Sequence, residues 1–181
     1  MDEPYQYLSS FLDGEEESKL QTFLASDELQ WCVEKFSIFG RETLAPRETL
    51  WFGDRGINYR YTGADHVAEG WPAPIQAARQ IIQASVGHGF NFVIVNRYRS
   101  GEDYMGWHRD NERGCTGPIA SLSLGAARTF KLATSEHDLH EIELEHNSLL
   151  LFNGALRHQL PKRKRIKEPR LNLTFRQISV S

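Results

Sequence analysis

Cysteine is scarce in this chain of 181 residues, since only Cys32 and Cys115 are present, and they form neither a disulfide framework nor a paired metal site. No run of about 18 apolar residues occurs, so we expect no membrane span. The N-terminus, MDEPYQYLSS, lacks the basic start and apolar stretch of a signal peptide. We therefore expect an intracellular protein, in the nucleus if the source is eukaryotic and in the cytoplasm if it is bacterial.

Charge is unevenly distributed along the sequence. The formal net charge is only −3, and residues 1–30 hold eight acids against one lysine. Between residues 157 and 170 the balance reverses, and Glu168 is the one acid among the basic residues Arg157, Lys162, Arg163, Lys164, Arg165, Lys167 and Arg170. A local basic patch can bind phosphate even when the total charge is negative. The alternative for this segment is a solvated loop.

The length fits one domain, and its first half predicts two helices. Asp13 is a candidate cap for a short helix whose buried face would carry Leu20, Phe23 and Leu24. A second helix follows Pro72 and Pro74, ends at Gly87 or Gly89, and has helical spacing of Ile75, Ala78, Ile82 and Val86. Leu29–Phe36 is apolar enough for a strand, and residues 40–63 favour hairpins or loops over a core helix.

After Gly89 the pattern changes to short apolar or alternating runs separated by turn residues. The expected strands are Phe90–Tyr98, Ile119–Leu124, Thr129–Ala133, Glu141–Leu144, Ser148–Phe152 and Arg170–Ile178. Several short strands in succession indicate a sandwich or barrel. We therefore predict an α+β protein in which helices and hairpins precede an all-β half.

His108, Arg109 and Asp110 form an H-x-D triplet. In an extended segment, residues two apart point to the same side, so His108 and Asp110 can reach one metal ion together. His158 follows the expected strand Ser148–Phe152 and is a candidate third ligand. Two histidines and one carboxylate form the facial triad of non-haem Fe(II) sites, which leaves positions open for a cosubstrate and O2. An H-x-D triplet in an exposed loop is the alternative.

The last expected strand alternates cleanly between apolar and polar residues. Its apolar face carries Leu171, Leu173 and Phe175, and its polar face carries Arg170, Asn172, Thr174 and Arg176. The polar face is either solvated or lines the mouth of a barrel, where the arginines could bind a dicarboxylate. Asn96 and Tyr98, two apart in another strand, share a face and could donate to the same ligand.

Taken together, these motifs resemble the AlkB-type nucleic-acid dioxygenases, most closely the branch of AlkB homologues 2 and 3. The resemblance runs from about residue 36 to residue 178 and includes NFVIVNRY (91–98), the H-x-D triplet, SLSLG (121–125), His158 and RLNLTFR (170–176). It implies a single domain over residues 1–181 with a double-stranded β-helix, or jelly roll. Residues 1–89 would form an N-terminal extension and nucleotide-recognition region with a nucleic-acid-binding hairpin, and residues 90–178 the catalytic core.

The same resemblance implies the roles of the site residues. His108, Asp110 and His158 would bind Fe(II) and would be the catalytic residues. In the family the first arginine of the last motif pairs with the far carboxylate of 2-oxoglutarate and the last lies near its metal-bound end, which points to Arg170 and Arg176. The residues that would surround the cosubstrate are Asn96, Tyr98, Arg170, Asn172, Thr174 and Arg176.

Substrate contacts are implied by softer matches. Phe39 would fill the gap left by an extracted base, Tyr61 would stack on that base, and Arg47 would lie near the DNA backbone. Core packing competes with the first two roles, and a plain surface arginine with the third. After Asp110 the branch usually has a second acid, whereas this chain has Asn111 followed by Glu112. Asparagine donates as well as accepts, so this departure bears on base selectivity.

The implied function is oxidative demethylation of N-alkylated bases such as 1-methyladenine and 3-methylcytosine, by hydroxylation of the alkyl group and release of formaldehyde. Fe(II), 2-oxoglutarate and O2 would be required. We expect DNA as the partner, duplex favoured over single strand, with RNA as a further candidate, and a monomer. The competing hypotheses are a 2-oxoglutarate dioxygenase for a protein or small molecule, and a non-enzymatic nucleic-acid-binding module.

Overall fold

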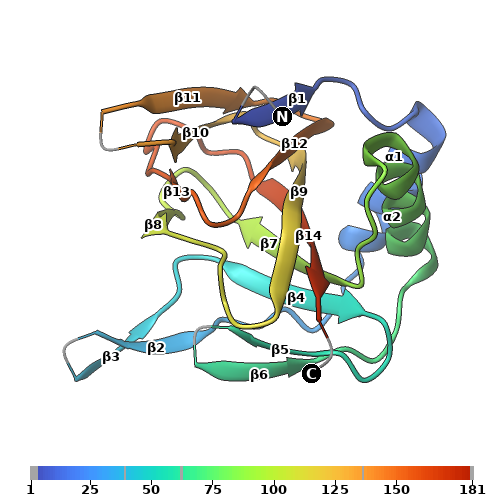
Figure 1. Cartoon of the computed structure of the whole chain (residues 1–181), viewed down its shortest axis with the longest axis horizontal. Helices are drawn as coiled ribbons and strands as arrows, with labels where there is room; N and C mark the ends of the chain where they lie inside the picture. The colour runs from blue at the N-terminus through green and yellow to red at the C-terminus, as the bar shows by residue number, and fades with distance from the viewer. Residues whose placement is uncertain (1–3, 39, 62, 136, 180–181) are drawn as a thin grey trace.

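Two antiparallel sheets face each other and form the centre of the molecule, with helices to one side and hairpins below (Figure 1). The computed structural model describes residues 4–38, 40–61, 63–135 and 137–179. In the larger sheet the strand order is β1 (Tyr5–Leu8), β12 (Ser148–Asn153), β9 (Cys115–Gly125), β14 (Arg170–Ile178), β7 (Phe92–Tyr98) and β4 (Glu48–Gly53).

The smaller sheet has four strands, and two separate hairpins complete the β-structure. Its order is β11 (Leu139–Leu144), β10 (Arg128–Ala133), β13 (Arg157–Leu160) and β8 (Met105–His108). The hairpins are β2 (Lys35–Ile38) with β3 (Arg41–Leu44), and β5 (Asn58–Tyr61) with β6 (Ala64–Val67).

Local sequence signals set the ends of both helices. The Asp13 carboxylate accepts hydrogen bonds from the amides of Glu15 and Glu16, which begins α1 (Gly14–Leu24) as an N-cap. α2 (Ala73–Val86) starts after Pro72 and ends at Gly87, whose φ of 66° is left-handed and therefore favours glycine. Both helices match the sequence prediction, and none of the described helices is long and apolar enough to cross a membrane.

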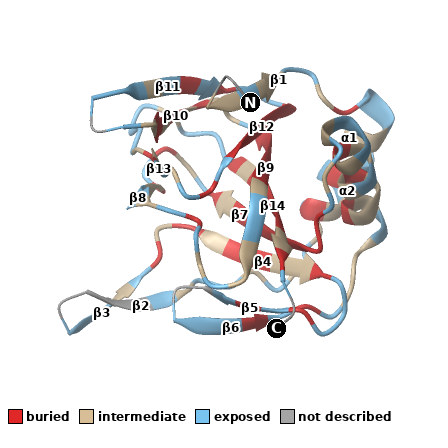
Figure 2. Cartoon of the chain, viewed as in Figure 1, coloured by how far each residue is buried: buried red, intermediate tan, exposed pale blue. Residues whose placement is uncertain are grey.

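The two faces of the larger sheet pack against different parts of the molecule. Leu173 and Phe175 of β14 pack with Leu20 of α1 and Ile82 of α2 in one apolar cluster, so the helices cover the outer face. A second cluster lies between the sheets and contains residues of both, such as Phe130 and Phe152. Figure 2 shows the central strands mostly buried, whereas β11 and the hairpins carry exposed residues. The alternation of β14 therefore turns its polar residues toward the space between the sheets.

The structure confirms the α+β class and the expected jelly-roll arrangement, and it corrects two boundaries. β1 and β4 belong to the larger sheet although they precede residue 90, so the expected division into 1–89 and 90–178 is not a structural boundary. The predicted strand Leu29–Phe36 is wrong over most of its length, because residues 29–34 contain only an isolated bridge from Cys32 to Thr49 and β2 begins at Lys35. Apolar composition predicted a strand there but could not supply a continuous partner strand.

Candidate active site

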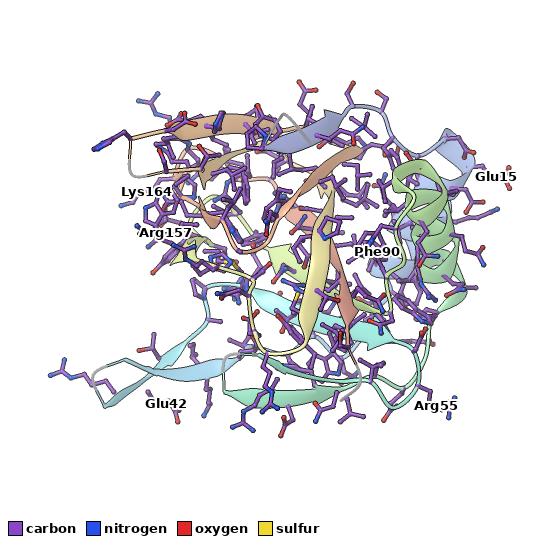
Figure 3. The ribbon with its side chains drawn as sticks, in the orientation of Figure 1. Glu15, Glu42, Arg55, Phe90, Arg157 and Lys164 are labelled. Carbon is purple, nitrogen blue, oxygen red and sulfur yellow. The ribbon has the colours of Figure 1, made fainter. Side chains whose placement is uncertain are left out.

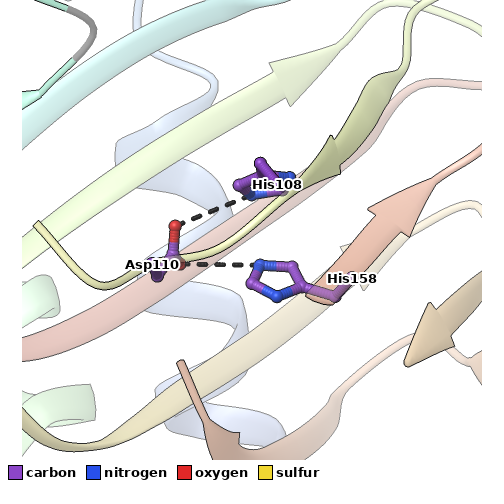
Figure 4. Close-up of side chains that lie close together, drawn as sticks. All are labelled: His108, Asp110 and His158. Carbon is purple, nitrogen blue, oxygen red and sulfur yellow. Dashed lines mark ion pairs between the residues drawn. The ribbon is translucent and has the colours of Figure 1, made fainter. Parts of the chain in front are cut away.

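Pairing of β13 with β8 brings the three predicted metal ligands together. His158 lies opposite His108 in the register, and Asp110 follows two residues after His108. Asp110 Oδ1 is 3.6 Å from His108 Nε2, and Asp110 Oδ2 is 3.8 Å from His158 Nε2 (Figure 4). One donor atom from each side chain lies within 4.8 Å of the others, and among the described residues this is the only such group of histidines, cysteines and acids.

Backbone carbonyls orient both imidazole rings. His108 Nδ1 is 2.8 Å from the carbonyl oxygen of Gly106, and His158 Nδ1 is 2.8 Å from that of Leu156. Each carbonyl can only accept, so Nδ1 carries the proton and Nε2 presents a lone pair to the centre of the group. Burial is the main reason that the pKa of His158 falls to about 4, which keeps this ring neutral, the form that binds metal.

Asp110 is the buried anion of the group. Burial opposes its ionisation, but Arg176, His158 and His108 together outweigh that effect, so the pKa of Asp110 lies below its usual value. Arg176 Nη2 donates to Oδ2 at 2.6 Å, whereas the buried Oδ1 has no hydrogen-bond partner. A buried, ionised oxygen without a donor is costly unless a cation completes it. Two neutral imidazoles and this carboxylate fit Fe(II).

A pocket lined by the metal ligands and by other polar and apolar side chains lies between the two sheets. Arg170 lies in its wall, is 2% exposed and donates to Ser123 Oγ at 2.9 Å. Its Nε has no hydrogen-bond partner, and no ion pair with an acid is found for it in the described ranges. Burial lowers the pKa of Arg170 to about 10. A carboxylate ligand would supply the missing counter-charge, which fits 2-oxoglutarate.

The other predicted cosubstrate residues line the same pocket. They are Asn96, Tyr98, Asn172, Thr174 and Arg176. Asn172 Nδ2 donates to Ser121 Oγ at 2.8 Å, and Thr174 Oγ1 accepts from Arg176 Nη1 at 2.8 Å. The guanidinium carbon of Arg170 lies 5.4 Å from the centre of the Tyr98 ring. Residues of β7 and β14 thus meet Asp110 across one cavity, which favours the pocket over the solvated face among the two alternatives that the alternation left open.

On the substrate side, Glu112 is held by a residue that the sequence analysis did not single out. The Tyr59 hydroxyl donates to Glu112 Oε2 at 2.6 Å, and burial is the first reason that the pKa of Tyr59 is raised. Tyr59 precedes Tyr61 by two residues in β5, and that spacing is the signal that could have identified it. Asn111 is exposed. Phe39 and the side chain of Tyr61 lie outside the described part of the structure.

Arg47 is placed differently from the expectation. It is 5% exposed, and its Nε donates to Asn96 Oδ1 at 3.0 Å, while Nη2 is 3.6 Å from Glu34 Oε2. A guanidinium turned inward and held in this way is not positioned to meet a DNA phosphate. The prediction of a DNA-backbone contact by Arg47 is therefore not supported, because the side chain is buried against Asn96 and Glu34.

The basic segment 162–167 is fixed to the body of the molecule. Arg163 N donates to Gly101 O at 2.7 Å, and Gly101 N donates to Ile166 O at 2.9 Å. A Cβ on residue 101 would lie 1.8 Å from the Arg163 carbonyl oxygen, so this approach requires glycine. Arg128, buried and also missed from sequence, donates to the carbonyl of Pro161 at 2.7 Å. Figure 3 places Lys164 and Arg157 on the side away from Glu15 of α1.

The chain is similar in sequence to a known family and to several known proteins. The model of the 2OG-Fe(II) oxygenase superfamily matches residues 5–176. The DNA oxidative demethylase ALKBH2 of Mus musculus is 37% identical over 161 residues, which cover 81% of this chain and 67% of that protein. The human ALKBH2 is 35% identical over 81% of this chain, and the human alpha-ketoglutarate-dependent dioxygenase alkB homolog 3 is 33% identical over 74%.

The chain spans only part of the length of these relatives, and its fold resembles a solved structure. The chain spans 62% of the human ALKBH2 and 52% of the human alkB homolog 3. The structure of OsALKBH1 superposes with a TM-score of 0.65 at 14% identity, covering 96% of this chain and 98% of that one, which supports the fold. The His–Asp–His group, the buried arginine pocket and the family match agree, and the chain therefore belongs to the 2OG-Fe(II) oxygenase superfamily as an AlkB-type member.

Proposed function

We propose that the protein is an oxidative demethylase that repairs N-alkylated bases, such as 1-methyladenine and 3-methylcytosine, in DNA. The observation that carries this proposal is the buried His108–Asp110–His158 group beside a pocket with an arginine that lacks an acidic partner among the described residues. Relatives that are 35–37% identical carry the name DNA oxidative demethylase, which supports the substrate class.

In the proposed site His108 and His158 would each hold Fe(II) through Nε2, and Asp110 would hold it through a carboxylate oxygen. Fe(II) bound there would couple the oxidative decarboxylation of 2-oxoglutarate to hydroxylation of the alkyl group: one oxygen atom of O2 would enter succinate, with loss of CO2, and the other the alkyl group, whose hydroxylated adduct would release formaldehyde. Arg176 keeps Asp110 ionised and oriented through its 2.6 Å hydrogen bond. The carbonyls of Gly106 and Leu156 keep both rings in the ligating tautomer.

Arg170 is the proposed anchor for the far carboxylate of 2-oxoglutarate. Its guanidinium is buried at the end of the polar face of β14, away from Arg176 and Asp110 at the other end. Asn96, Tyr98, Asn172 and Thr174 line the wall between these ends. The strand thus holds the dicarboxylate in a fixed orientation toward the metal ligands.

Glu112 is the proposed group that favours a cationic base. Methylation at adenine N1 or cytosine N3 fixes a positive charge, and a nearby carboxylate stabilises a cation. The Tyr59 hydroxyl holds Glu112, and Tyr59 packs 5.5 Å from the guanidinium of Arg176, which bonds to Asp110. This links the proposed base-reading carboxylate to the metal site. Phe39, Tyr61 and Asn111 remain proposed substrate contacts.

The exposed basic segment 162–167 is the proposed phosphate contact. Lys162, Arg163, Lys164 and Arg165 line one surface groove, and the backbone bonds to Gly101 hold that groove in place. Such a patch supports nucleic acid over a small metabolite as the substrate. We propose duplex DNA as the preferred form, with single-stranded DNA or RNA as outcomes of the test.

The proposed setting is intracellular, nuclear or cytoplasmic according to the source, and the proposed state is a monomer. Both cysteines are free, and Cys32 is exposed, which agrees with a reducing compartment. All residues proposed for the metal and the cosubstrate come from one chain, so the site does not need a second copy.

The test is mass spectrometry of an oligonucleotide that carries one 1-methyladenine, as single strand and as duplex, incubated with the protein, Fe(II), 2-oxoglutarate and O2. We expect loss of one methyl group with wild type and none with His158→Ala. His137→Ala is the matched control, because His137 is exposed and far in sequence from the ligands; it should demethylate like wild type.

The competing functions predict other results. If iron-loaded protein turns over 2-oxoglutarate but leaves every methylated oligonucleotide intact, the substrate is a protein or a small molecule. If the protein binds oligonucleotides but neither Fe(II) nor 2-oxoglutarate, it is a non-enzymatic binding module. The buried triad and Arg170 argue against the second outcome, because a binding module needs neither.

A further inference from the structure

A buried hydrogen bond joins the start of β4 to the cosubstrate pocket. Arg47, directly before β4, donates from Nε to Asn96 Oδ1 at 3.0 Å, and the two residues are 5% and 3% exposed. β4 pairs with β7 in register, with Thr49 opposite Asn96, so the backbone fixes the separation of the two side chains. Asn96 also lines the pocket that holds the metal ligands.

Behind Arg47, an acidic residue balances its charge. Glu34 Oε2 is 3.6 Å from Arg47 Nη2, and Glu34 Oε1 is 2.8 Å from His66 Nε2. The side chains of Glu34, Arg47 and His66 are 8%, 6% and 5% exposed. Burying an arginine is costly unless it is paired and hydrogen-bonded, and this chain of contacts meets that condition. The network therefore holds the guanidinium in one place rather than adding net charge to the pocket.

The chemistry of the two groups fixes the orientation of the Asn96 amide. A guanidinium only donates, so the amide atom that faces Arg47 must be the oxygen. The NH2 group of Asn96 is then free to face an acceptor on the pocket side, and a carboxylate is such an acceptor. We propose that Arg47 is a positioning residue, which holds the Asn96 amide so that its NH2 group donates to 2-oxoglutarate.

This inference deepens the proposed function and rests on the proposed role of Asn96 in cosubstrate binding. It also accounts for the inward direction of Arg47. The neighbouring Arg97 provides the contrast, since it lies next to Asn96 on β7 but forms its ion pair with Glu48 at 2.6 Å. Its guanidinium stacks on Trp31 at 4.2 Å, and it does not line the pocket.

The test measures cosubstrate binding without nucleic acid and without turnover. Calorimetric titration of 2-oxoglutarate into the full chain loaded with Mn(II) compares wild type, Arg47→Gln, Asn96→Ala and the double variant. We expect Asn96→Ala and Arg47→Gln each to raise the Kd about tenfold, which corresponds to one lost or misdirected hydrogen bond. The double variant should bind as Asn96→Ala does, because Arg47 acts through Asn96.

Arg97→Gln is the matched control, since it removes an arginine and an ion pair from the same two strands and should leave the Kd unchanged. An unchanged Kd for folded Arg47→Gln, or a double variant whose loss is the product of the single losses, would overturn the inference. An unchanged Kd for Asn96→Ala would instead reject the proposed role of Asn96. If Arg47→Gln does not fold, Arg47→Lys keeps the charge beside Glu34 without the Nε donor, and the same comparison applies.

Discussion

Arg170 is a buried guanidinium whose hydrogen-bond partner among the described residues is a hydroxyl rather than a carboxylate. Burial lowers its pKa to about 10, so keeping it charged without a ligand costs free energy of folding. An anionic cosubstrate that binds the Arg170 guanidinium would offset this cost. We therefore expect Arg170→Met to leave the free energy of unfolding unchanged or to raise it by about 1 kcal/mol.

The same substitution should weaken 2-oxoglutarate binding roughly 100-fold or more, because two charge-assisted hydrogen bonds are lost. Urea unfolding and titration of the Mn(II)-loaded protein measure the two quantities. Arg79→Met is the control, since Arg79 is partnered by the Phe90 carbonyl and stacks on Trp71. It should destabilise the fold and leave cosubstrate binding intact. A destabilised Arg170→Met that still binds 2-oxoglutarate would contradict the assignment.

The sequence located the residues around the pocket but not the direction of every side chain. Spacing of two along β14 placed Arg170 and Arg176 on one face, and the structure puts both in the pocket wall. The resemblance placed Arg47 near the DNA backbone, and its inward direction was not predicted, because its burial depends on Glu34 and on Asn96, which lie far from it in sequence. A resemblance carries over the residue type, whereas the contacts that turn a side chain inward come from packing.

At the scale of elements, segments with strong periodicity were predicted correctly, whereas two short strands were not predicted. α1, α2 and β14 follow from caps, helical spacing and clean alternation, respectively. β8 and β13 were not anticipated as strands, although both carry metal ligands. Each has four residues, which is too short to establish an alternation, and their pairing depends on the sheet rather than on local preference. The H-x-D motif therefore identified His108 and Asp110 as ligands although β8 was not predicted as a strand.

The basic segment 162–167 is the element whose role can be measured by salt dependence. Each phosphate contact releases counterions, so the slope of log K against log salt for duplex DNA reports the number of contacts. Lys164 and Arg165 are exposed and line the groove. We expect the Lys164→Ala/Arg165→Ala double variant to bind duplex DNA more weakly, with a slope shallower by about 2.

Filter binding or fluorescence anisotropy at several salt concentrations measures this slope. Lys19→Ala is the control, because Lys19 pairs with Glu15 and Glu16 on α1, and Figure 3 shows Glu15 at the opposite side of the molecule from Lys164. Its slope should equal that of wild type. An unchanged slope for the double variant would show that the segment is a solvated loop, the alternative that composition left open.

At the scale of the whole molecule, the candidate site joins the two sheets. His108 and His158 belong to the smaller sheet, whereas Arg170 and Arg176 belong to the larger one. Around the pocket Arg176 pairs with Asp110 across the two sides, and rings of the two sheets pack together, such as Phe130 with Phe152. A metal ion and a dicarboxylate that contact both sheets should therefore stabilise the native state as a unit.

We expect Mn(II) with 2-oxoglutarate at about 100 times its Kd to add roughly 2.7 kcal/mol to the free energy of unfolding. For a chain of this length that corresponds to a rise in Tm of about 5–10 °C. Amide exchange should slow in β8 and β13 as well as in β14, because the ligands link the two sheets. His158→Ala should show no such shift when its own Tm is compared with and without ligands, and a chelator should reverse the shift in wild type. A Tm that rises equally in wild type and His158→Ala would mean that the ligands bind elsewhere, and protection confined to β14 would mean that the cosubstrate is held by the larger sheet alone.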